Sequence, residues 1–484
     1  MPDHDPETER CRRTAKVRQF LAAFVASLLG FTSGSVTGWM SPMQPLLMSP
    51  DPPVGTDPMT EDNIAWLGSI NFVGTVLGSF FWGIVADSWG RKKTACLVAI
   101  PFILHWILTM VAKNFYWLIV ARLIAGIGNN GAVASVPAFI SEMAQDDLRG
   151  FFGSFYMMFV NFGIMYSYVL GTYLHYYWLS IACIVIPLFF LLTFIWIPET
   201  PMFLLKNGQS VEAEKSLFWY RGGDAAETEK VFSSYKLETS TKNNKLSVMS
   251  LFATRGTTKA FILGIALVIS LQTCGIMPIL SFAVSIFEMC GTSLTPYHSS
   301  LIMGSMQVVF TCYSSFLVDR LGRKFLLVTS MMVMAVSLAV LGTYLFFLHG
   351  QSVDSVFRWT PVVSLSVCVS AYAIGVAPIP FIIIGEIFPT NIKGYAIAKL
   401  LLVLGASAFA IVKCFPIMKS LLKPHGLFWF YAVFSLLFSI FFYCYLPETK
   451  GKPLSEILRI LNKSNSTEDH PAEDRKSTEH IPLS

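Results

Sequence analysis

The sequence predicts an all-α membrane protein in which twelve transmembrane helices form two pseudo-symmetric six-helix bundles. Three observations support this fold class: the composition, the length of the apolar runs, and an internal repeat. Of the 484 residues, 54% are hydrophobic and only 13% are charged, and the mean hydropathy is +0.58. A soluble protein normally has about a quarter of its residues charged. The composition therefore excludes the soluble, disordered, fibrous and disulfide-rich classes.

Twelve apolar runs are each long enough to cross a hydrocarbon core of ~30 Å as a helix. In chain order, and called spans 1 to 12 below, they cover about 19–41, 64–86, 94–112, 116–140, 151–172, 176–197, 259–287, 300–318, 325–347, 361–385, 396–418 and 427–446. The first run is longer than the core of a signal peptide and no cleavage site follows it, so we expect it to be retained as span 1.

The positions of lysine and arginine indicate the orientation, because cytoplasmic segments carry the excess of positive charge. With the N-terminus inside, the outer segments contain only Lys113, Arg358, Lys413, Lys419 and Lys423. The last three lysines run against the rule, but the overall bias is strong. We therefore expect a multi-pass protein of the plasma membrane with both termini in the cytoplasm.

Hydrophobicity breaks divide the chain into five parts. They are a cytoplasmic N-tail (1–18), an N-terminal six-helix bundle (19–197), a cytoplasmic helical linker (198–258), a C-terminal six-helix bundle (259–446) and a cytoplasmic C-tail (447–484). The linker contains amphipathic pieces rich in Glu and Lys. From about residue 462 the tail has almost no apolar residues to bury, so we expect it to be disordered.

An internal repeat relates the two halves. The segment Asp87-Ser88-Trp89-Gly90-Arg91-Lys92 recurs as Asp319-Arg320-Leu321-Gly322-Arg323-Lys324, Glu142 and Arg149-Gly150 recur as Glu386 and Lys393-Gly394, and Pro198-Glu199-Thr200 recurs as Pro447-Glu448-Thr449. The members of each pair follow spans 2 and 8, 4 and 10, and 6 and 12. Parallel repeats of six helices are typical of alternating-access transporters, whose substrate site lies between the halves near the bilayer midplane.

The repeated loops contain a candidate cytoplasmic gate. Each loop has a carboxylate at a helix end, a glycine for a tight turn, and a guanidinium that can bind a carboxylate with two hydrogen bonds. We expect ion pairs there to close the inner ends of the two bundles together, which favours the outward-open state. The alternative, that the cations only follow the positive-inside rule, leaves the acids and glycines unexplained. The gate residues are Asp87, Gly90, Arg91, Glu142, Arg149, Asp319, Gly322, Arg323, Glu386 and Lys393.

Over about residues 18–455 the sequence resembles the sugar porter family of the major facilitator superfamily. Besides the repeated loops, the motifs that carry the resemblance are Arg122-Leu123 to Gly126-x-Gly128, Pro198-Glu199-Thr200-Pro201, Trp219-Tyr220-Arg221-Gly222, Gly375-x-x-Pro378-Ile379-Pro380, Gly385-Glu386-Ile387-Phe388-Pro389 and Pro447-Glu448-Thr449-Lys450-Gly451. Thr60-Glu61-Asp62 followed by Trp66-Leu67-Gly68-Ser69-Ile70 is most like the insect facilitated trehalose transporters. The resemblance implies the major facilitator fold and facilitative transport of a sugar, with trehalose or a hexose as the expected substrate.

The resemblance also implies a sugar site between the bundles. Gln272 and Gln307 match amides that hydrogen-bond sugar hydroxyls, Asn161 is a third candidate amide, and Phe381 matches an aromatic stacking position. Interhelical hydrogen bonding is the structural alternative for these amides. Five polar positions of the family are apolar here: Met157, Leu271, Met277, Leu404 and Gly405. Since each lost hydrogen bond is worth ~0.5–1.5 kcal/mol, a less polar organic solute and a non-transporting sugar sensor stay as alternatives.

Two features inside the spans have structural explanations. Gly126-x-Gly128-x-x-Gly131 has the spacing of a dinucleotide motif, but it lies within span 4, where small residues favour close helix packing. His105 in span 3 and Arg122 in span 4 are expected to be packing residues with hydrogen bonds, although ionisable groups in spans are functional candidates. The acidic residues all lie outside the middle of the spans. We therefore expect uniport rather than proton symport.

Several classes of chemistry are not indicated by any motif. No catalytic Ser/His/Asp or His/Glu pattern and no Cys-x-x-Cys pair occurs, so we expect neither an enzyme nor a site for a cofactor or metal. The expected partners are a small neutral solute of the sugar class and the lipid bilayer, not nucleic acid. We expect the protein to be a monomer.

Overall fold

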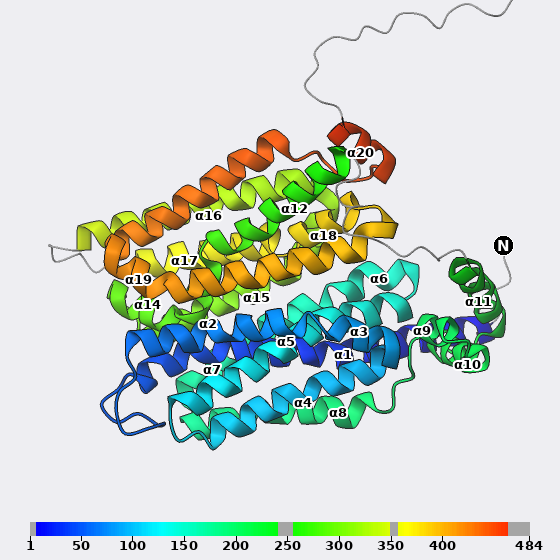
Figure 1. Ribbon diagram of the computed structural model, residues 1–484, viewed down its shortest axis with the longest axis horizontal. Coiled ribbons are helices and arrows are strands. Elements are labelled where there is room, and N and C mark those ends of the chain that lie inside the picture. The colour runs from blue at the N-terminus through cyan, green and yellow to red at the C-terminus, as the bar shows by residue number, and fades with distance from the viewer. Residues whose placement is uncertain (1–5, 241–254, 349–356, 463–484) are drawn as a thin grey trace, which may run out of the picture.

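The computed structural model describes residues 6–240, 255–348 and 357–462, and every regular element in these ranges is a helix. The helices form two bundles that lie side by side along the long axis. In Figure 1 the N-terminal bundle, blue to cyan, lies below the C-terminal bundle, green to orange. The all-α, two-bundle architecture predicted from the sequence is confirmed. The predicted disorder from about residue 462 concerns 463–484, outside the described residues.

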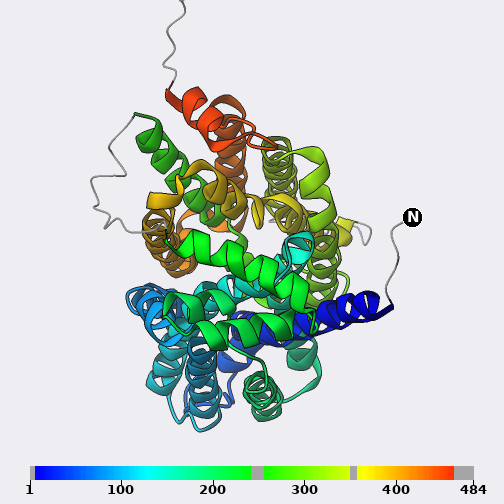
Figure 2. The ribbon, with the colours of Figure 1, turned by 90° about the vertical axis from the view of Figure 1, so that its right-hand side faces the viewer.

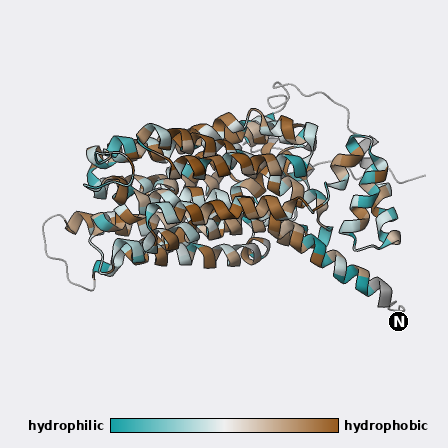
Figure 3. Ribbon diagram, turned by 90° about the horizontal axis from the view of Figure 1, so that it is seen from below, coloured by the Kyte–Doolittle hydropathy of each residue, from teal (hydrophilic) through white to brown (hydrophobic). Residues whose placement is uncertain are grey.

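The N-terminal bundle consists of α1 (Pro6–Leu47), α2 (Glu61–Gly78), α3 (Trp82–Trp89), α4 (Arg91–Met110), α5 (Phe115–Met143), α6 (Asp146–Gly153), α7 (Phe155–Tyr173) and α8 (Tyr176–Phe194). The first helix has 42 residues, which corresponds to about 63 Å at 1.5 Å per residue. It is therefore longer than a hydrocarbon core, and it includes most of the segment expected as an N-tail. Its hydrophilic first turns extend beyond the bundle in Figure 3.

Three short helices follow the N-terminal bundle: α9 (Pro201–Lys206), α10 (Ser210–Tyr220) and α11 (Ala225–Ser240). The long first helix fastens them. Arg18 donates a hydrogen bond to the carbonyl oxygen of Trp219 at 3.0 Å, and Gln19 donates one to that of Tyr220 at 2.9 Å. Gly222 has a φ of +72°, and a Cβ there would lie 2.1 Å from the carbonyl oxygen of Cys11. Only glycine permits this close contact between α1 and the end of α10.

The C-terminal bundle is more interrupted. It contains α12 (Arg255–Thr273), α13 (Ile276–Ser281), α14 (Ala283–Cys290), α15 (Pro296–Leu321), α16 (Arg323–Leu348), η2 (Phe357–Trp359), α17 (Thr360–Ala371), η3 (Tyr372–Val376), α18 (Ile379–Ile387), α19 (Thr390–Tyr445) and α20 (Leu454–Asn462). The long α19 has a kink at Lys423, whose φ is +56°. It therefore contains both span 11 and span 12.

Every predicted span coincides with a helix or a series of broken helices. By length and hydropathy alone, eight helices of the described chain could cross a membrane, or nine if α2 and α3, which are bent by 44°, count as one span. This count is lower than twelve because α19 contains two spans, and because α7 and α15, at spans 5 and 8, are not among the eight. Figure 3 shows a hydrophobic middle with hydrophilic residues gathered toward both ends.

The glycines with dinucleotide-like spacing serve helix packing. A Cβ on Gly126 in α5 would lie 1.9 Å from the carbonyl oxygen of Asn71 in α2, and one on Gly74 would lie 2.1 Å from that of Leu123. A Cβ on Gly131 would lie 2.4 Å from Val98. The absence of side chains therefore lets α2, α4 and α5 approach closely, as expected for small residues in spans.

Candidate functional site

The repeated loops define one end of the molecule, here called the basic end. It lies on the right in Figure 1, with α9, α10, α11 and α20, and faces the viewer in Figure 2. The opposite end, here called the far end, contains the start of α2 with Glu61 and Asp62, and the part of α19 with Lys413 and Lys419. The interface between the bundles runs from one end to the other.

At the basic end of the N-terminal bundle, Arg91 at the start of α4 binds two carboxylates. Its Nε lies 3.0 Å from Glu142 Oε1 and its Nη1 lies 2.8 Å from Asp87 Oδ1. The other oxygen of Glu142 accepts a hydrogen bond from the hydroxyl of Thr200 at 2.6 Å. Burial acts to lower the pKa of Arg91, but the two carboxylates outweigh it and the pKa is raised. This ion pair joins α4 and α5 within one bundle.

Gly90 makes room for a second carboxylate. Its φ is +104°, and a Cβ there would lie 2.3 Å from Glu199 Oε2. Both carboxylate oxygens of Glu199 accept the backbone N–H of Lys92, at 2.9 and 3.0 Å, so Glu199 caps α4 from 107 residues away along the chain. Burial raises the pKa of Glu199, although backbone hydrogen bonds from Lys92, Thr200 and Lys93 oppose the shift. Glu199 belongs to the sequence repeat, yet it is not among the predicted gate residues.

The C-terminal bundle repeats this arrangement. Gly322 has a φ of +90°, and the carboxylate of Glu448 accepts the backbone N–H of Arg323 at 3.0 Å and that of Lys324 at 3.1 Å. The Nε of Arg323 lies 3.4 Å from Glu386 Oε1. Burial acts to raise the pKa of Glu448, but four backbone N–H donors outweigh it and the pKa is lowered. The side chain of Asp319 lies outside the described part of the structure.

The two other predicted gate residues have different neighbours. Arg149 pairs with Asp146 at 2.8 Å, three residues earlier in α6, and the ammonium group of Lys393 lies beside Gly385, which precedes Glu386 in the chain. In the described residues, the ion pairs of the basic end link groups of the same bundle. The expected closure of the two bundles by these residues belongs to the outward-open state and stays a prediction.

Two of the predicted sugar-site residues meet where α7 and α15 cross between the bundles. Gln307 donates a hydrogen bond to Asn161 Oδ1 at 2.6 Å, and Asn161 donates one to the hydroxyl of Thr311 at 2.9 Å. Thr311 lies one turn beyond Gln307 and donates to its carbonyl oxygen at 2.8 Å. Thr311 is not among the residues predicted from the sequence, although its spacing from Gln307 places both on one helix face.

Gln272 lies at a break in span 7. It is buried near the end of α12, and its Oε1 has no hydrogen-bond partner among the described residues. The chain then turns at Gly275, whose φ is +77° and where a Cβ would lie 2.5 Å from the ring of Tyr431. An unsatisfied buried amide oxygen beside a helix break can accept a hydrogen bond from a solute hydroxyl.

Span 10 is also broken near its middle. The π-helical turn Tyr372–Val376 separates α17 from α18, which carries Phe381 as a half-buried side chain. Interrupted helices at the interface of repeats are typical of transporter binding sites, and π-helical turns are frequent at functional sites. The broken spans 7 and 10 and the amides on α7 and α15 therefore form the candidate site.

The apolar positions noted in the sequence lie in packed surroundings. Leu271 is buried next to Gln272, and Met157 provides only its carbonyl oxygen, to Asn161 at 3.1 Å. A Cβ on Gly405 in α19 would lie 2.7 Å from Val76 in α2. Gly405 thus allows the two bundles to approach, which gives this position a packing role.

Arg122 and His105 have local partners. Arg122 is buried and donates hydrogen bonds to the carbonyl oxygens of Val36 at 2.6 Å and Leu67 at 3.0 Å, so it links α1, α2 and α5. His105 Nδ1 lies 3.1 Å from the carbonyl oxygen of Ala121. The recorded hydrogen bonds of both side chains are to other residues of the N-terminal bundle, not to residues of the candidate site.

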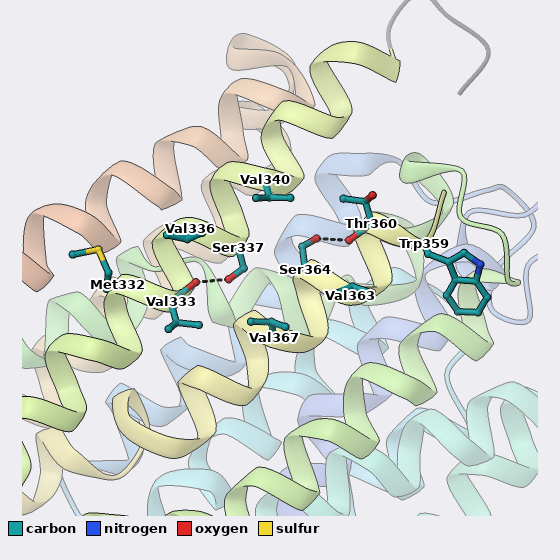
Figure 4. A pocket seen from close by; sticks show the side chains of 10 residues that line it. All are labelled: Met332, Val333, Val336, Ser337, Val340, Trp359, Thr360, Val363, Ser364 and Val367. Carbon is teal, nitrogen blue, oxygen red and sulfur yellow. Dashed lines mark hydrogen bonds between the residues drawn. The ribbon is translucent and has the colours of Figure 1, made fainter. Parts of the chain in front are cut away.

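A crevice of about 560 Å³ between α16 and α17 is a separate feature (Figure 4). Its walls are mostly apolar, and its lining residues are Met332, Val333, Val336, Ser337, Val340, Trp359, Thr360, Val363, Ser364 and Val367. The hydroxyls of Ser337 and Ser364 each donate to a carbonyl oxygen of their own helix at 2.7 Å. The crevice therefore offers little to a solute with hydroxyl groups, and it contains none of the predicted site residues.

Comparisons with known proteins agree with this architecture. Residues 22–461 match the family model described as "Sugar (and other) transporter". The chain is 31% identical over 458 residues to bovine solute carrier family 2, facilitated glucose transporter member 8, covering 91% of this chain and 94% of that protein. It is 33% identical over 444 residues to the facilitated trehalose transporter Tret1 of Bombyx mori, covering 91% and 86%. The fold is similar to the inward-open xylose transporter XylE of E. coli, with a TM-score of 0.74, 20% identity, and coverage of 92% and 99%.

Proposed function

Because the chain belongs to the Sugar (and other) transporter family, we propose that it is a uniporter that moves a sugar across the plasma membrane by alternating access. The expected substrate class is a hexose or trehalose, as in the names of the glucose and trehalose transporters that it resembles. The observation that carries the proposal is the pair of helix breaks at spans 7 and 10 beside Gln272 and Phe381. A sensor that only binds would not need both bundles to keep the repeated loop structures.

The basic end is the cytoplasmic end in this proposal, because of the positive-inside rule. The bundles contact each other toward the far end, where the backbone N–H of Val284 donates to Ser41 Oγ at 3.1 Å and Tyr297 donates to the carbonyl oxygen of Pro42 at 3.4 Å. Tyr168 donates to the carbonyl oxygen of Leu280 at 2.6 Å. These contacts support an inward-facing state.

Solute binding would compete with protein hydrogen bonds. The amide of Gln307 and the carboxamide of Asn161 bind each other across the interface, so sugar hydroxyls would replace that bond and add one to Gln272. The exchange changes the free energy little per bond, so specificity would depend on few polar contacts. The apolar Leu271 and Met277 favour a less polar organic solute as the second candidate.

Uniport is supported by the positions of the carboxylates. Glu61 and Asp62 start α2, and Glu142 and Glu386 lie near the basic-end termini of α5 and α18. Proton coupling normally uses an ionisable group in the pathway that changes its protonation during the cycle. We therefore expect the solute to equilibrate without being concentrated.

Radiotracer uptake in oocytes, with trehalose, glucose and a panel of neutral solutes, tests this function. We expect saturable entry of one sugar that a protonophore does not change. Accumulation above the outside concentration that a protonophore abolishes would contradict uniport, and His105 would then be the first residue to replace.

The site is tested with Gln272→Ala and Gln307→Ala. Gln272→Ala should raise KM by about three- to tenfold at normal surface expression, which corresponds to one hydrogen bond of ~0.5–1.5 kcal/mol. Gln307→Ala should raise KM less, because the solute bond there replaces the bond to Asn161. Ser337→Ala, in the crevice, is the matched control and should leave KM unchanged. If both glutamine variants lower thermal stability but leave kinetics unaltered, the amides serve only interhelical bonding.

A further inference from the structure

Two ion pairs at the far end join the N-terminal to the C-terminal bundle. Lys413 Nζ lies 2.6 Å from Asp62 Oδ1, and Lys419 Nζ lies 2.6 Å from Glu61 Oε1. The partners are 351 and 358 residues apart in the chain. Among the described residues, these are the ion pairs that cross between the bundles. They also account for two lysines that contradict the positive-inside rule.

The carboxylates of these pairs are placed by the start of a helix. Thr60 caps α2 by accepting the backbone N–H of Asn63 at 3.3 Å. Glu61 and Asp62 are in its first turn, where the helix dipole favours negative charge. The cap therefore fixes the backbone that carries both carboxylates, and it orders them without a partner from the other bundle.

Besides Asp62, Lys413 contacts a second residue of the N-terminal bundle. Its Nζ lies 4.3 Å from the centroid of the Trp66 ring, and Trp66 also contacts Phe409 with ring centroids 6.1 Å apart. The side chain of Lys413 is only 16% exposed, whereas that of Asp62 is 70% exposed. The ammonium group thus lies between a carboxylate and an aromatic face, both of which favour its charge. Within the described part of the chain, the contact recorded for the ammonium group of Lys419 is the one with Glu61.

From these pairs toward the middle of the molecule, the bundles are in close contact. A Cβ on Gly68 in α2 would lie 2.9 Å from the ring of Phe282 and 3.2 Å from Val412 in α19. Gly405 lies against Val76 further along the same two helices. The α2–α19 contact therefore continues from the ion pairs into the interface, and opening of the far end must separate the ion pairs as well.

We propose that Glu61, Asp62, Lys413 and Lys419 form a latch that holds the far end closed and sets the fraction of molecules open toward that side. The inference rests on the proposed alternating-access function and its orientation. Each cycle would break both pairs, and exposed ion pairs are weak enough for this, since one pair shifts an equilibrium by about two- to fivefold. Salt on that side should weaken the latch by screening.

Hydrogen–deuterium exchange of the full-length protein in nanodiscs tests the latch without any substrate, so its failure is distinguishable from failure of the proposed function. Asp62→Asn and Lys419→Gln should each raise exchange at the far-end termini of α2 and α14 by about two- to fivefold. Lys113→Met, which removes a far-end charge that has no ion pair among the described residues, is the control and should leave exchange unchanged.

Variants with reversed charges make the test more specific. Glu61→Lys and Lys419→Glu should each raise far-end exchange, and the double variant should lower it again at α14, while the start of α2 keeps a lysine that its helix dipole disfavours. The double variant Asp62→Lys with Lys413→Asp should restore it only partly, because the Trp66 contact is lost. Unchanged exchange in the single variants, or equal changes at both ends with no recovery in either double variant, would overturn the latch and leave a merely structural role.

Discussion

The two ends of the molecule use the same types of charged side chain for different connections. At the basic end, Arg91 and Glu142 are 11% and 16% exposed, and their pair lies within one bundle. At the far end, Asp62 and Glu61 are 70% and 53% exposed, and their pairs cross between the bundles. Carboxylates at the basic end also accept backbone N–H groups, whereas the far-end carboxylates bind one lysine each. In the proposed cycle, the Arg91–Glu142 pair, with both partners shielded, persists, whereas each far-end pair that breaks has an exposed carboxylate.

The largest expected effect comes from breaking the shielded pair. Glu142→Ala leaves the guanidinium of Arg91 with only the exposed Asp87 as a carboxylate partner. We expect a loss of about 1–3 kcal/mol in stability, somewhat less than the ~3–5 kcal/mol for a fully buried pair. Asp62→Ala at the far end is the control and should cost no more than ~1 kcal/mol. Thermal unfolding of the purified protein measures which variant loses more stability. Equal losses for Glu142→Ala and Asp62→Ala would contradict the contrast between the two ends.

A comparable effect is expected from the glycines with positive φ. Gly90 combines φ +104° with ψ 162°, a conformation that is essentially restricted to glycine, so Gly90→Ala should cost about 1–3 kcal/mol, to which the contact with Glu199 contributes. Gly322→Ala meets Glu448 at 2.9 Å and should cost slightly less. Gly291 ends α14 in the αL region with φ +61° and ψ 49°, and a Cβ there meets nothing within 4 Å, so Gly291→Ala should cost only the ~1–2 kcal/mol of that milder backbone strain. A different ranking in thermal unfolding would show that the carboxylates move away freely.

The smallest effect is a difference in pH dependence between Glu199 and Glu448. The pKa of Glu448 is lowered in the folded state, so its contribution to stability is present above the unfolded pKa of ~4.3 and is lost as pH falls through the folded pKa. The pKa of Glu199 is raised, so its contribution is present below the unfolded pKa and is lost as pH rises through the folded pKa.

The variants Glu448→Gln and Glu199→Gln test these opposite signs. The destabilisation caused by Glu448→Gln should be largest near neutral pH and should shrink on acidification. That caused by Glu199→Gln should be smallest near neutral pH and should grow on acidification. Melting temperatures of the wild type and both variants between about pH 4 and 7 give the two slopes. Parallel slopes would mean that burial does not outweigh the backbone hydrogen bonds at Glu199.

Much of the fold follows from the sequence for a local reason. A span is recognised from its own hydropathy, because backbone groups in a hydrocarbon core must be satisfied within the helix. The repeated loops predict the two-bundle plan, and the glycines at 90 and 322 adopt the positive φ that their turns require. The long first helix was underestimated, since its hydrophilic start is stabilised by contacts with Trp219 and Tyr220, which lie 201 residues further along the chain.

The sequence by itself determined the helical class, the two-fold repeat, and the residue types available at each end. Only the tertiary structure decided which charges pair. Arg91 binds Glu142 between α4 and α5, and Lys413 binds Asp62 across the interface. The sequence contains a signal for the second pair, because the acids at the start of span 2 and the lysines in and just after span 11 share the side that the positive-inside rule leaves poor in positive charge. The choice of partner depends on how helices that are far apart in the chain pack together. Hydropathy describes each segment by itself, so it does not show which helices become neighbours.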